Sequence, residues 1–258
     1  MKELFAPLRA LAREAGRAIM AVRARGFQVE YKADRSPLTE ADTASQAVLA
    51  PGLARLLPDV PVLSEEGRDI PFAERRNWSR FLLVDPLDGT KEFVKELGEF
   101  CVCVALMQDG FPMLGVVHAP VPDRSWFGGP GLGAFRQDGD GEARPMAVRE
   151  PGPDGLVAVA SRSHNTPELD DYLATLPVRE RISAGSAIKF CLVAEGAADI
   201  YARFGPTMEW DTAAGQAVVE GAGGSMTLHD GRRFFYNKES LLNPGFLVLG
   251  RRTPPASR

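Results

Sequence analysis

The sequence predicts a two-lobed chain of the α+β and α/β classes, with helices layered on sheets. Residues 1–150 combine amphipathic helical patterns with strand-like runs joined by glycine turns, which is typical of helices packed on a largely antiparallel sheet. Residues 151–258 alternate strands and helices, which favours α/β wiring around a mixed sheet. A segment rich in proline and glycine, residues 149–155, separates the two patterns, so we place the lobe boundary there.

Composition limits the class of function. The chain has 258 residues, of which 45% are hydrophobic and 25% charged, as in ordinary globular proteins. The net charge of −4 argues against binding duplex nucleic acid but allows a local basic pocket for a nucleotide. Residues 1–16 lack the apolar core of a signal peptide, and no run approaches membrane-spanning length. We expect a cytosolic protein, with peripheral attachment to the inner face of the cell membrane left open.

The most informative stretch is FLLVDPLDGT, residues 81–90. Its apolar start predicts a strand buried on both faces, with Asp85 at its carboxyl end. Pro86 and Gly89 predict a tight turn that brings Asp88 back beside Asp85. Two neighbouring carboxylates repel each other unless a cation lies between them, and hard oxygen donors favour Mg²⁺ over zinc. A surface Asp-Gly turn is the alternative that this stretch leaves open.

Two helices are expected before this stretch. Apolar residues recur at helical spacing over residues 4–22 and predict a structural, amphipathic helix. Thr39 is expected at the N-cap of a second helix that Pro58 ends, with Asp42 three residues into it. Capping explains both polar residues, but the helix start would also aim Asp42 at whatever lies before it, so a functional role stays open.

Acidic residues also follow a second short strand. Residues 60–63 predict this strand, which leads into Glu65 and Glu66. Consecutive side chains point in different directions, so at most one of the two glutamates is expected to be a ligand; a solvated loop is the alternative. After the central stretch, residues 90–97 have helical character and Gly98 ends it. A helix start offers unpaired N–H groups, so we expect a phosphate there.

Antiparallel strands complete the first lobe. Residues 100–106 and 113–117 predict a hairpin with its turn at residues 109–110. Cys101 and Cys103 would point to the same face of the first of these strands. We expect them to be core thiols rather than a disulfide.

The second lobe carries basic and acidic candidates. We expect strands at residues 156–160 and 200–201, and between them two helices at residues 167–176 and 186–195. Lys189 and Arg203 fall within or after these elements, and each alone is more typical of a surface charge. Asp211 is expected in the first turn of a helix rich in small residues, where an acid could simply complement the helix dipole.

Combined, these motifs resemble a known family. DPLDGT at residues 85–90 and WDTAAG at residues 210–215 resemble the two signatures of the inositol monophosphatase superfamily of Mg²⁺-dependent, lithium-sensitive phosphatases. The motifs KADRSPLTEAD, VLSEEG, SRSH, GSAIKFCLVAEG, ARFGPT and LLNPGF are similar to those of CysQ-type 3′(2′),5′-bisphosphate nucleotidases. The resemblance runs from residue 32 to residue 246. It implies a layered αβαβα sugar-phosphatase fold, with an antiparallel sheet in the N-terminal lobe and a mixed sheet in the C-terminal lobe.

The resemblance implies a metal site and a catalytic pair. The ligands of two or three Mg²⁺ ions would be Glu65, Asp85 as the bridge, the carbonyl of Leu87, Asp88 and Asp211. Two ions about 3.5–4 Å apart would offset the charge that repels an attacking hydroxide from a phosphate ester. Thr90 would hydrogen-bond the attacking water. Asp42 would orient Thr90 or the water of a third ion and would accept the proton.

It also implies a substrate pocket. The residues expected to contact substrate are Glu65, Leu87, Asp88, Gly89, Thr90, Ser161, His164, Gly185, Ser186, Lys189 and Asp211. Arg162 and Arg203 are further candidates for this pocket. The implied reaction removes the 3′-phosphate of adenosine 3′,5′-bisphosphate to give AMP, in sulfate assimilation, with 3′-phosphoadenosine 5′-phosphosulfate as a second substrate.

Three other functions are compatible with part of these motifs. An inositol or sugar monophosphatase would share the metals, but the SRSH loop and Lys189 favour the nucleotidase. Haloacid-dehalogenase phosphatases space their two aspartates two apart, whereas Asp85 and Asp88 are three apart. A catalytically silent sensor of phosphate and metal is the alternative outside enzymes, and retention of every expected ligand together with Thr90 argues against it. A monomer and a homodimer both stay open.

Overall fold

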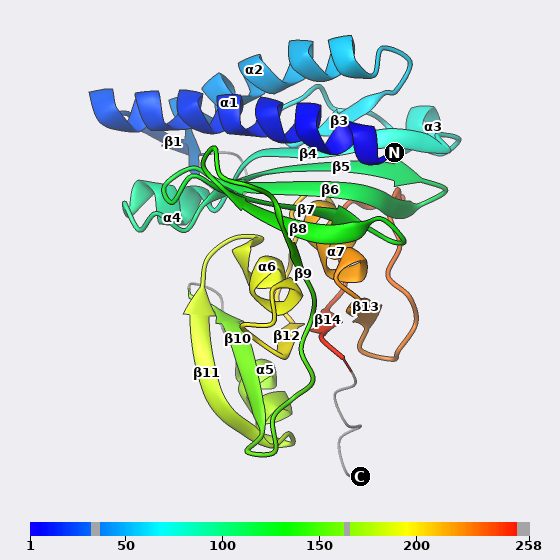
Figure 1. Cartoon of the computed structure of the whole chain (residues 1–258). Coiled ribbons are helices and arrows are strands. Elements are labelled where there is room, and N and C mark those ends of the chain that lie inside the picture. Colours follow the sequence, from blue (N-terminus) through cyan, green and yellow to red (C-terminus); the bar gives the residue numbers. More distant parts are fainter. Residues whose placement is uncertain (32–36, 163–165, 252–258) are drawn as a thin grey trace.

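The larger sheet has seven strands in the order β3-β4-β5-β6-β7-β8-β9. The computed structural model describes residues 1–31, 37–162 and 166–251 (Figure 1). The strands are β3 Val62–Ser64, β4 Arg80–Asp88, β5 Cys101–Gln108, β6 Phe111–Ala119, β7 Arg124–Gly129, β8 Gly133–Asp138 and β9 Arg144–Met146. Only the β3–β4 pair is parallel among these neighbours. The predicted, largely antiparallel sheet is confirmed.

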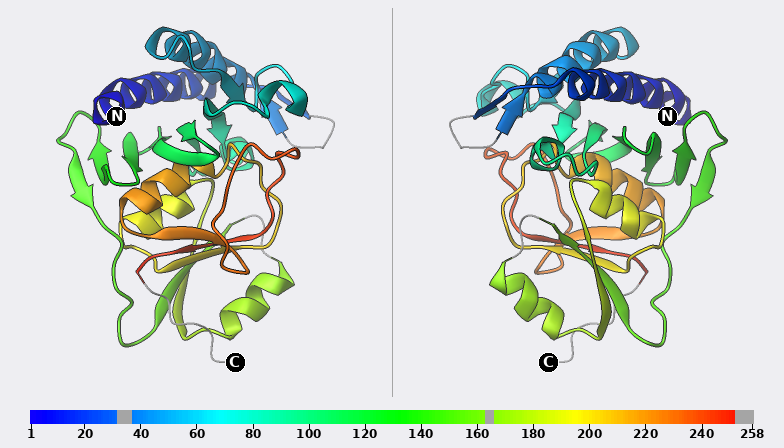
Figure 2. Two further views of the ribbon diagram at one scale, coloured as in Figure 1. Left: turned by 90° about the vertical axis from the view of Figure 1, so that its right-hand side faces the viewer. Right: turned by 90° about the vertical axis from the view of Figure 1, so that its left-hand side faces the viewer.

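Helices cover both faces of this sheet. Helices α1 (Phe5–Arg25) and α2 (Glu40–Leu56) pack on one face, and α6 (Ile188–Ala194) and α7 (Ala213–Gly221) lie against the other (Figures 1 and 2). The two-residue period of β5 sorts its side chains accordingly. Val102 and Val104 belong to the core under α1 and α2, whereas Cys101 and Cys103 belong to the core under α6 and α7.

The smaller sheet has five strands in the order β11-β10-β12-β14-β13. These are β10 Leu156–Ser161, β11 Val178–Ala184, β12 Ile200–Arg203, β13 Ser225–Leu228 and β14 Phe246–Leu249. Pairs β10–β11 and β10–β12 are parallel and the others antiparallel, so the predicted mixed sheet is confirmed. Helix α5 (Pro167–Ala174) covers its outer face (Figure 1). The layers therefore follow the expected αβαβα order.

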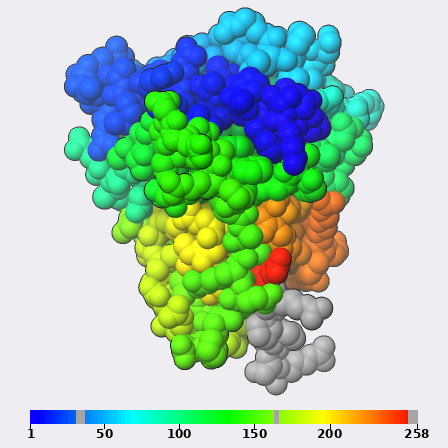
Figure 3. Space-filling view, viewed as in Figure 1, coloured from blue at the N-terminus to red at the C-terminus, as the bar shows by residue number. Residues whose placement is uncertain are grey.

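The segment at residues 149–155 lies between the last strand of the larger sheet and the first strand of the smaller one. In Figure 3 the helices of the first lobe, blue to cyan, form one end of the molecule. Helix α7 nevertheless packs on β5, β6 and β7, and one apolar core runs through both lobes. We propose that residues 1–150 and 151–258 form two lobes of one folding unit.

Short elements complete the described chain. They are the 3₁₀ turn η1 Lys2–Leu4, β1 Val29–Tyr31, β2 Pro37–Thr39, α3 Phe72–Arg75 and α4 Thr90–Val94. Helix α4 is shorter than the predicted 90–97, because Glu96 adopts a left-handed backbone with φ of 59° and the N–H of Leu97 bonds back to the carbonyl of Glu92. Among the described helices, none combines the length and apolarity that crossing a bilayer requires.

Candidate active site

The end of β4 brings Asp85 and Asp88 to one face of the sheet. Two residues three apart in a regular strand point to opposite faces. Here Asp85 pairs with Cys103 and Asp88 with Cys101, so the β4–β5 ladder contains a β-bulge that absorbs one extra residue and restores the common face. The N–H of Leu87 donates to Oδ1 of Asp85 at 2.9 Å. The predicted tight turn is wrong, because the strand continues through the bulge and keeps its pairing.

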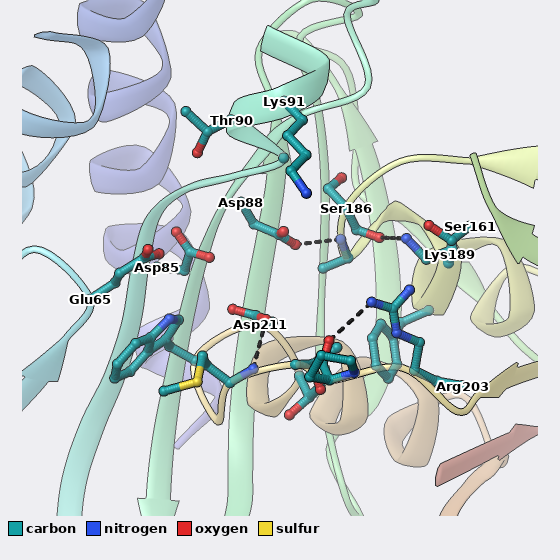
Figure 4. Close-up of a pocket in the computed structure, with 18 of the residues that line it drawn as sticks. Glu65, Asp85, Asp88, Thr90, Lys91, Ser161, Ser186, Lys189, Arg203 and Asp211 are labelled. Atoms are coloured by element: carbon teal, nitrogen blue, oxygen red, sulfur yellow. Dashed lines mark hydrogen bonds between the residues drawn. The ribbon is translucent and has the colours of Figure 1, made fainter. Parts of the chain in front are cut away.

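Three carboxylates converge beside this bulge. Oxygen atoms of Glu65, Asp85 and Asp211 all lie within 4.8 Å of one another (Figure 4). Glu65 directly follows β3, and its N–H extends the strand pairing by donating to the carbonyl of Val84 at 3.1 Å. The side chain of Glu65 thus comes from the end of β3, that of Asp85 from β4, and that of Asp211 from the second lobe. The acids that the sequence placed at element ends therefore do meet.

Asp211 lies in a turn before α7. The sequence placed it in the first turn of the helix, but α7 begins at Ala213 with Thr212 as its N-cap, so that placement is wrong by two residues. Oδ2 of Asp211 instead accepts the N–H of Met208 at 2.8 Å. This bond closes the turn on itself and leaves the carboxylate facing Asp85 rather than the helix end (Figure 4).

The cluster concentrates negative charge out of water. Burial raises the pKa of Asp85, and the charges of Glu65, Asp88 and Asp211 raise it further. Burial and the charge of Asp88 likewise raise the pKa of Asp211. Carboxylates that resist ionisation together are stabilised by a cation between them. Hard oxygen donors in this number fit Mg²⁺, which the residues present could hold.

Asp88 stands beside the three carboxylates rather than among them. Burial raises its pKa to about 6, while the charge of Lys189 lowers it. Oδ2 of Asp88 accepts the N–H of Ala187 at 2.5 Å, which ties β4 of the first lobe to the approach to α6 in the second. Asp88 lines the same cavity as Asp85 and Asp211. It is therefore available to a second ion next to the first.

Thr90 and Asp42 form a contact between two helix starts. Oγ1 of Thr90 lies 3.3 Å from Oδ1 of Asp42 and 3.2 Å from the carbonyl oxygen of Leu87. The other oxygen of Asp42, Oδ2, accepts the N–H and the hydroxyl of Thr39, both at 2.8 Å. The capping box predicted for α2 is therefore present. Burial raises the pKa of Asp42 to about 6.

Gly89 joins the bulge to α4. Its φ of 94° is left-handed, and a Cβ there would come within 3.1 Å of the carbonyl oxygen of Glu99 and of the Cβ of Ser186. Glycine therefore suits both the backbone and the space. Its left-handed turn starts α4 at Thr90, and both residues line the cavity. Leu87 lines the same cavity.

Basic groups stand across the cavity, whose volume is about 430 Å³. Lys189 and Arg203 are both buried and line it with Ser161 and Ser186. Nζ of Lys189 donates to the carbonyl of Ser186 at 2.6 Å. A guanidinium nitrogen of Arg203 donates to the carbonyl of Pro206 at 3.0 Å. Figure 4 shows these cations and the carboxylates facing a common space.

Two other pocket candidates lie elsewhere. Among the described residues that line the cavity, Gly185 is absent, and its N–H donates to Oε2 of Glu99 at 2.9 Å. The guanidinium of Arg162 makes a two-pronged contact with the same carboxylate at 2.7 and 2.8 Å. These two therefore brace the wall behind Ser186. His164 lies outside the described residues.

Several lining residues escaped the sequence reasoning. They are Lys91, Glu92, Phe190, Tyr201, Met208, Trp210, Leu242 and Phe246. Figure 4 shows the ammonium of Lys91 reaching from α4 toward the cavity near Ser186. Lys91 directly follows the DPLDGT motif, and Phe190, Trp210, Leu242 and Phe246 lie within motifs quoted above, but a motif does not indicate which of its residues face a cavity. Tyr201 and Met208 carry no such signal, since they reach the cavity only through the tertiary fold.

Comparison with known proteins connects this site to a family. A sequence profile described as the inositol monophosphatase family matches residues 1–251. Two curated relatives are named 3′(2′),5′-bisphosphate nucleotidase CysQ. The one from Salmonella typhimurium is 48% identical over 242 residues, covering 92% of this chain and 96% of the relative, and the one from Escherichia coli is 49% identical with the same coverage.

Solved structures agree. CysQ from Bacteroides thetaiotaomicron, described as a bacterial member of the inositol monophosphatase family, matches with a TM-score of 0.83 and 41% identity, covering 96% of this chain and 98% of that one. An IMPase from Thermotoga maritima matches with a TM-score of 0.80 and 26% identity, covering 96% and 92%. The similarity thus spans both lobes of the chain.

Proposed function

The chain belongs to the inositol monophosphatase family, and from this premise we propose that it is a Mg²⁺-dependent 3′(2′),5′-bisphosphate nucleotidase. It would hydrolyse the 3′-phosphate of adenosine 3′,5′-bisphosphate to give AMP and phosphate. The observation that supports this most is one cavity with three converging carboxylates on one side and the buried Lys189 and Arg203 on the other. A substrate with two phosphates needs two positively charged regions. The ions held by the carboxylates would supply one, and the two basic side chains would supply the other.

The carboxylates would hold the ions. We assign two or three Mg²⁺ ions to Glu65, Asp85, Asp88, Asp211 and the carbonyl of Leu87, with Asp85 shared. When bound, Mg²⁺ would lower the pKa of water and offset the charge that develops on the ester oxygens. The raised pKa values of Asp85 and Asp211 support this assignment, because a cation would relieve the repulsion that causes part of them.

Asp42 and Thr90 would handle the attacking water. The hydroxyl of Thr90 lies between Asp42 and the carbonyl of Leu87, so it can hold a water on the side of the carboxylates. Asp42 can take the proton through Thr90. Its pKa of about 6 suits a general base that must be ionised near neutral pH yet still accept a proton. The amides of Gly89 and Thr90 would bind the scissile phosphate.

The basic side would recognise the second phosphate. Lys189 and Arg203 are buried, so their charges act at low dielectric and are little screened by salt. Ser161 and Ser186 add hydroxyl groups at the same wall, and Lys91 adds an exposed cation at the rim. His164, which follows β10 in the sequence, remains a proposed contact. We propose 3′-phosphoadenosine 5′-phosphosulfate, which would fit the same two regions, as a second substrate, and sulfate assimilation in the cytosol as the setting of the reaction.

A substrate panel tests this function. Purified protein with Mg²⁺ should release phosphate from adenosine 3′,5′-bisphosphate much faster than from AMP or inositol 1-phosphate, and lithium should inhibit. Faster release from inositol 1-phosphate would favour the alternative function, an inositol or sugar monophosphatase, which the family relationship also accommodates. Absence of turnover on every ester, with retained phosphate binding, would favour a silent phosphate and metal sensor.

A further inference from the structure

Two thiols lie directly beneath Asp88. Cys101 and Cys103 project from the same face of β5, with their Sγ atoms 3.7 Å apart. Sγ of Cys101 is 3.9 Å from Oδ2 of Asp88. One ligand atom from each of the three residues lies within 4.8 Å of the others. Neither cysteine is in a disulfide, and the proposed phosphatase reaction uses neither thiol.

These separations match a tetrahedral metal site. Zinc–sulfur bonds of about 2.3 Å at tetrahedral angles put two sulfurs about 3.8 Å apart, and a sulfur and a carboxylate oxygen about 3.6 Å apart. The observed 3.7 and 3.9 Å differ from these by a few tenths of an ångström, which rotation of the Asp88 carboxylate can absorb. The bulge in β4 pairs Asp88 with Cys101 and brings its side chain to the face of the sheet that carries both thiols.

We propose that Cys101, Cys103 and Asp88 form a binding site for a soft divalent cation such as Zn²⁺ or Cd²⁺, which shares Asp88 with the hard oxygen site proposed for Mg²⁺. Thiolates select such ions, whereas Mg²⁺ takes oxygen ligands. Coordination releases the two thiol protons to solvent. A fourth position is open to the hydroxyl of Ser186, 3.4 Å from Sγ of Cys101, or to water.

The site is reached from the cavity. Both thiols are buried, but Asp88 and Ser186 line the cavity and contact Cys101. An ion that enters the cavity by the same route as the substrate therefore meets the thiols behind these two residues. Occupation would draw Asp88 toward β5 and away from its proposed Mg²⁺. The soft ion is therefore an inhibitor. This inhibition rests on the proposed function, whereas binding of the ion does not.

The third cysteine supplies a matched control. Cys191 in α6 is also buried and reduced, but it is not part of the thiol and carboxylate group. Cys191→Ala therefore removes a core thiol without removing a ligand. Cys103→Ala removes one ligand, and Cys103→Ser keeps the volume of the side chain in case the alanine variant is unstable. Thermal melts would establish that each variant is folded.

Direct binding is measured with Cd²⁺ in excess Mg²⁺, by the ultraviolet absorption of thiolate-to-cadmium charge transfer. We expect one equivalent to saturate the band in the unmodified protein and in Cys191→Ala, and the saturating band to be lost in both Cys103 variants. A band of the same size and midpoint in the Cys103 variants would overturn the site. This readout does not depend on any phosphatase activity.

Inhibition is measured separately with Zn²⁺ on the phosphatase reaction. The Zn²⁺ concentration for half inhibition should rise at least about tenfold in Cys103→Ser, the scale on which loss of a metal partner acts, and stay unchanged in Cys191→Ala. Equal inhibition of all three proteins would overturn the link to Asp88. If no substrate is turned over, the proposed function fails while the Cd²⁺ titration still decides the site.

Discussion

Asp42 serves two helices at once: its Oδ2 caps α2 through Thr39, while its Oδ1 lies 3.3 Å from the hydroxyl of Thr90 at the start of α4. One residue thus joins a structural role to a contact with Thr90, which lines the cavity. The two roles predict different losses when they are removed separately.

Asp42→Asn should lower kcat by about 10²–10⁴-fold, the usual contribution of a general base, with little change in KM. Asparagine remains a good acceptor for the cap, so the fold should persist. Because the base must be ionised, and burial raises the pKa of Asp42 to about 6, the unmodified enzyme should lose activity as pH falls through about 6. The variant should lack this acidic limb.

Thr39→Ala is the matched control for the cap. It removes the hydroxyl that bonds Asp42 and the N–H of Ala41, and should destabilise the protein by about 0.5–2 kcal/mol while leaving kcat within a fewfold. Steady-state kinetics and denaturant melts separate the two variants. Similar kinetic losses in both would reduce Asp42 to a capping residue.

Removing Mg²⁺ should make the protein's stability depend on pH. The folded-state pKa values of Asp85, Asp88 and Asp211 are raised, that of Asp88 from 3.8 to about 6. The contribution of Asp88 to stability is therefore complete below about pH 4 and lost as pH rises through about 6. The raised pKa values of Asp85 and Asp211 act in the same direction, since their ionisation at higher pH also destabilises the folded state. Melts of the chelated protein between pH 5 and 8 should show this loss, and Mg²⁺ should reverse it. A chelated protein as stable at pH 8 as at pH 5 would contradict it.

Asp85→Asn should abolish turnover and yet stabilise the chelated protein at pH 8, since it deletes a buried charge that Glu65, Asp88 and Asp211 repel. The increase in melting temperature with Mg²⁺ should shrink at the same time. Calorimetric melts with and without Mg²⁺ measure both effects. Normal turnover by this variant would remove the bridging role from Asp85.

Lys189→Met should weaken the use of a bisphosphate more than that of a monophosphate. Methionine keeps most of the buried stem and deletes the charge at the cavity wall. Comparison of kcat/KM on both substrates gives the ratio. Arg162→Ala is the control, because Arg162 pairs with Glu99 behind the wall and should leave that ratio unchanged. Equal losses on the two substrates would mean that Lys189 does not bind the second phosphate.

A buried ion pair positions the turn that carries Asp211. Glu209 is fully buried and contacts Nζ of Lys238 at 2.5 Å and the N–H of Asn237 at 2.8 Å. Lys238→Met should cost about 3–5 kcal/mol, since it leaves Glu209 without its cation. Adding Glu209→Gln should recover part of that loss. Denaturant unfolding of the single and double variants tests this, and a double variant no more stable than Lys238→Met would refute it.

Sequence patterns predicted most of the fold, because periodicity and turn residues are local signals. They revealed α1, the α2 cap and the β5–β6 hairpin. They missed β11, in which three consecutive residues are charged, with signs that alternate. Such a run suits an exposed sheet edge but resembles a loop in sequence. The prediction of a tight turn after Asp85 was also wrong because local sequence was not enough. A bulge is defined by its pairing with β5 rather than by its own residues.

The acidic side of the site was also foreseeable, because each carboxylate lies near the end of a strand or the start of a helix, and each of the two signatures is one continuous stretch of sequence. The basic side was less so. Gly185 and Arg162 sit next to lining residues in sequence, but their bonds to Glu99 turn them away from the cavity. Lys91 and Trp210 line it without having been proposed. Which neighbour of a motif faces the cavity depends on backbone direction, and only the packed structure specifies that.

The central claim is that cations held by Glu65, Asp85, Asp88 and Asp211 drive removal of a 3′-phosphate. The most direct measurement incubates adenosine 3′,5′-bisphosphate with the purified protein, with Mg²⁺ or with a chelator, and identifies the nucleotide product by chromatography. We predict that the product is 5′-AMP, and that it forms with Mg²⁺ but not with the chelator. A 3′-phosphorylated product, or an equal yield with chelator, would contradict the account.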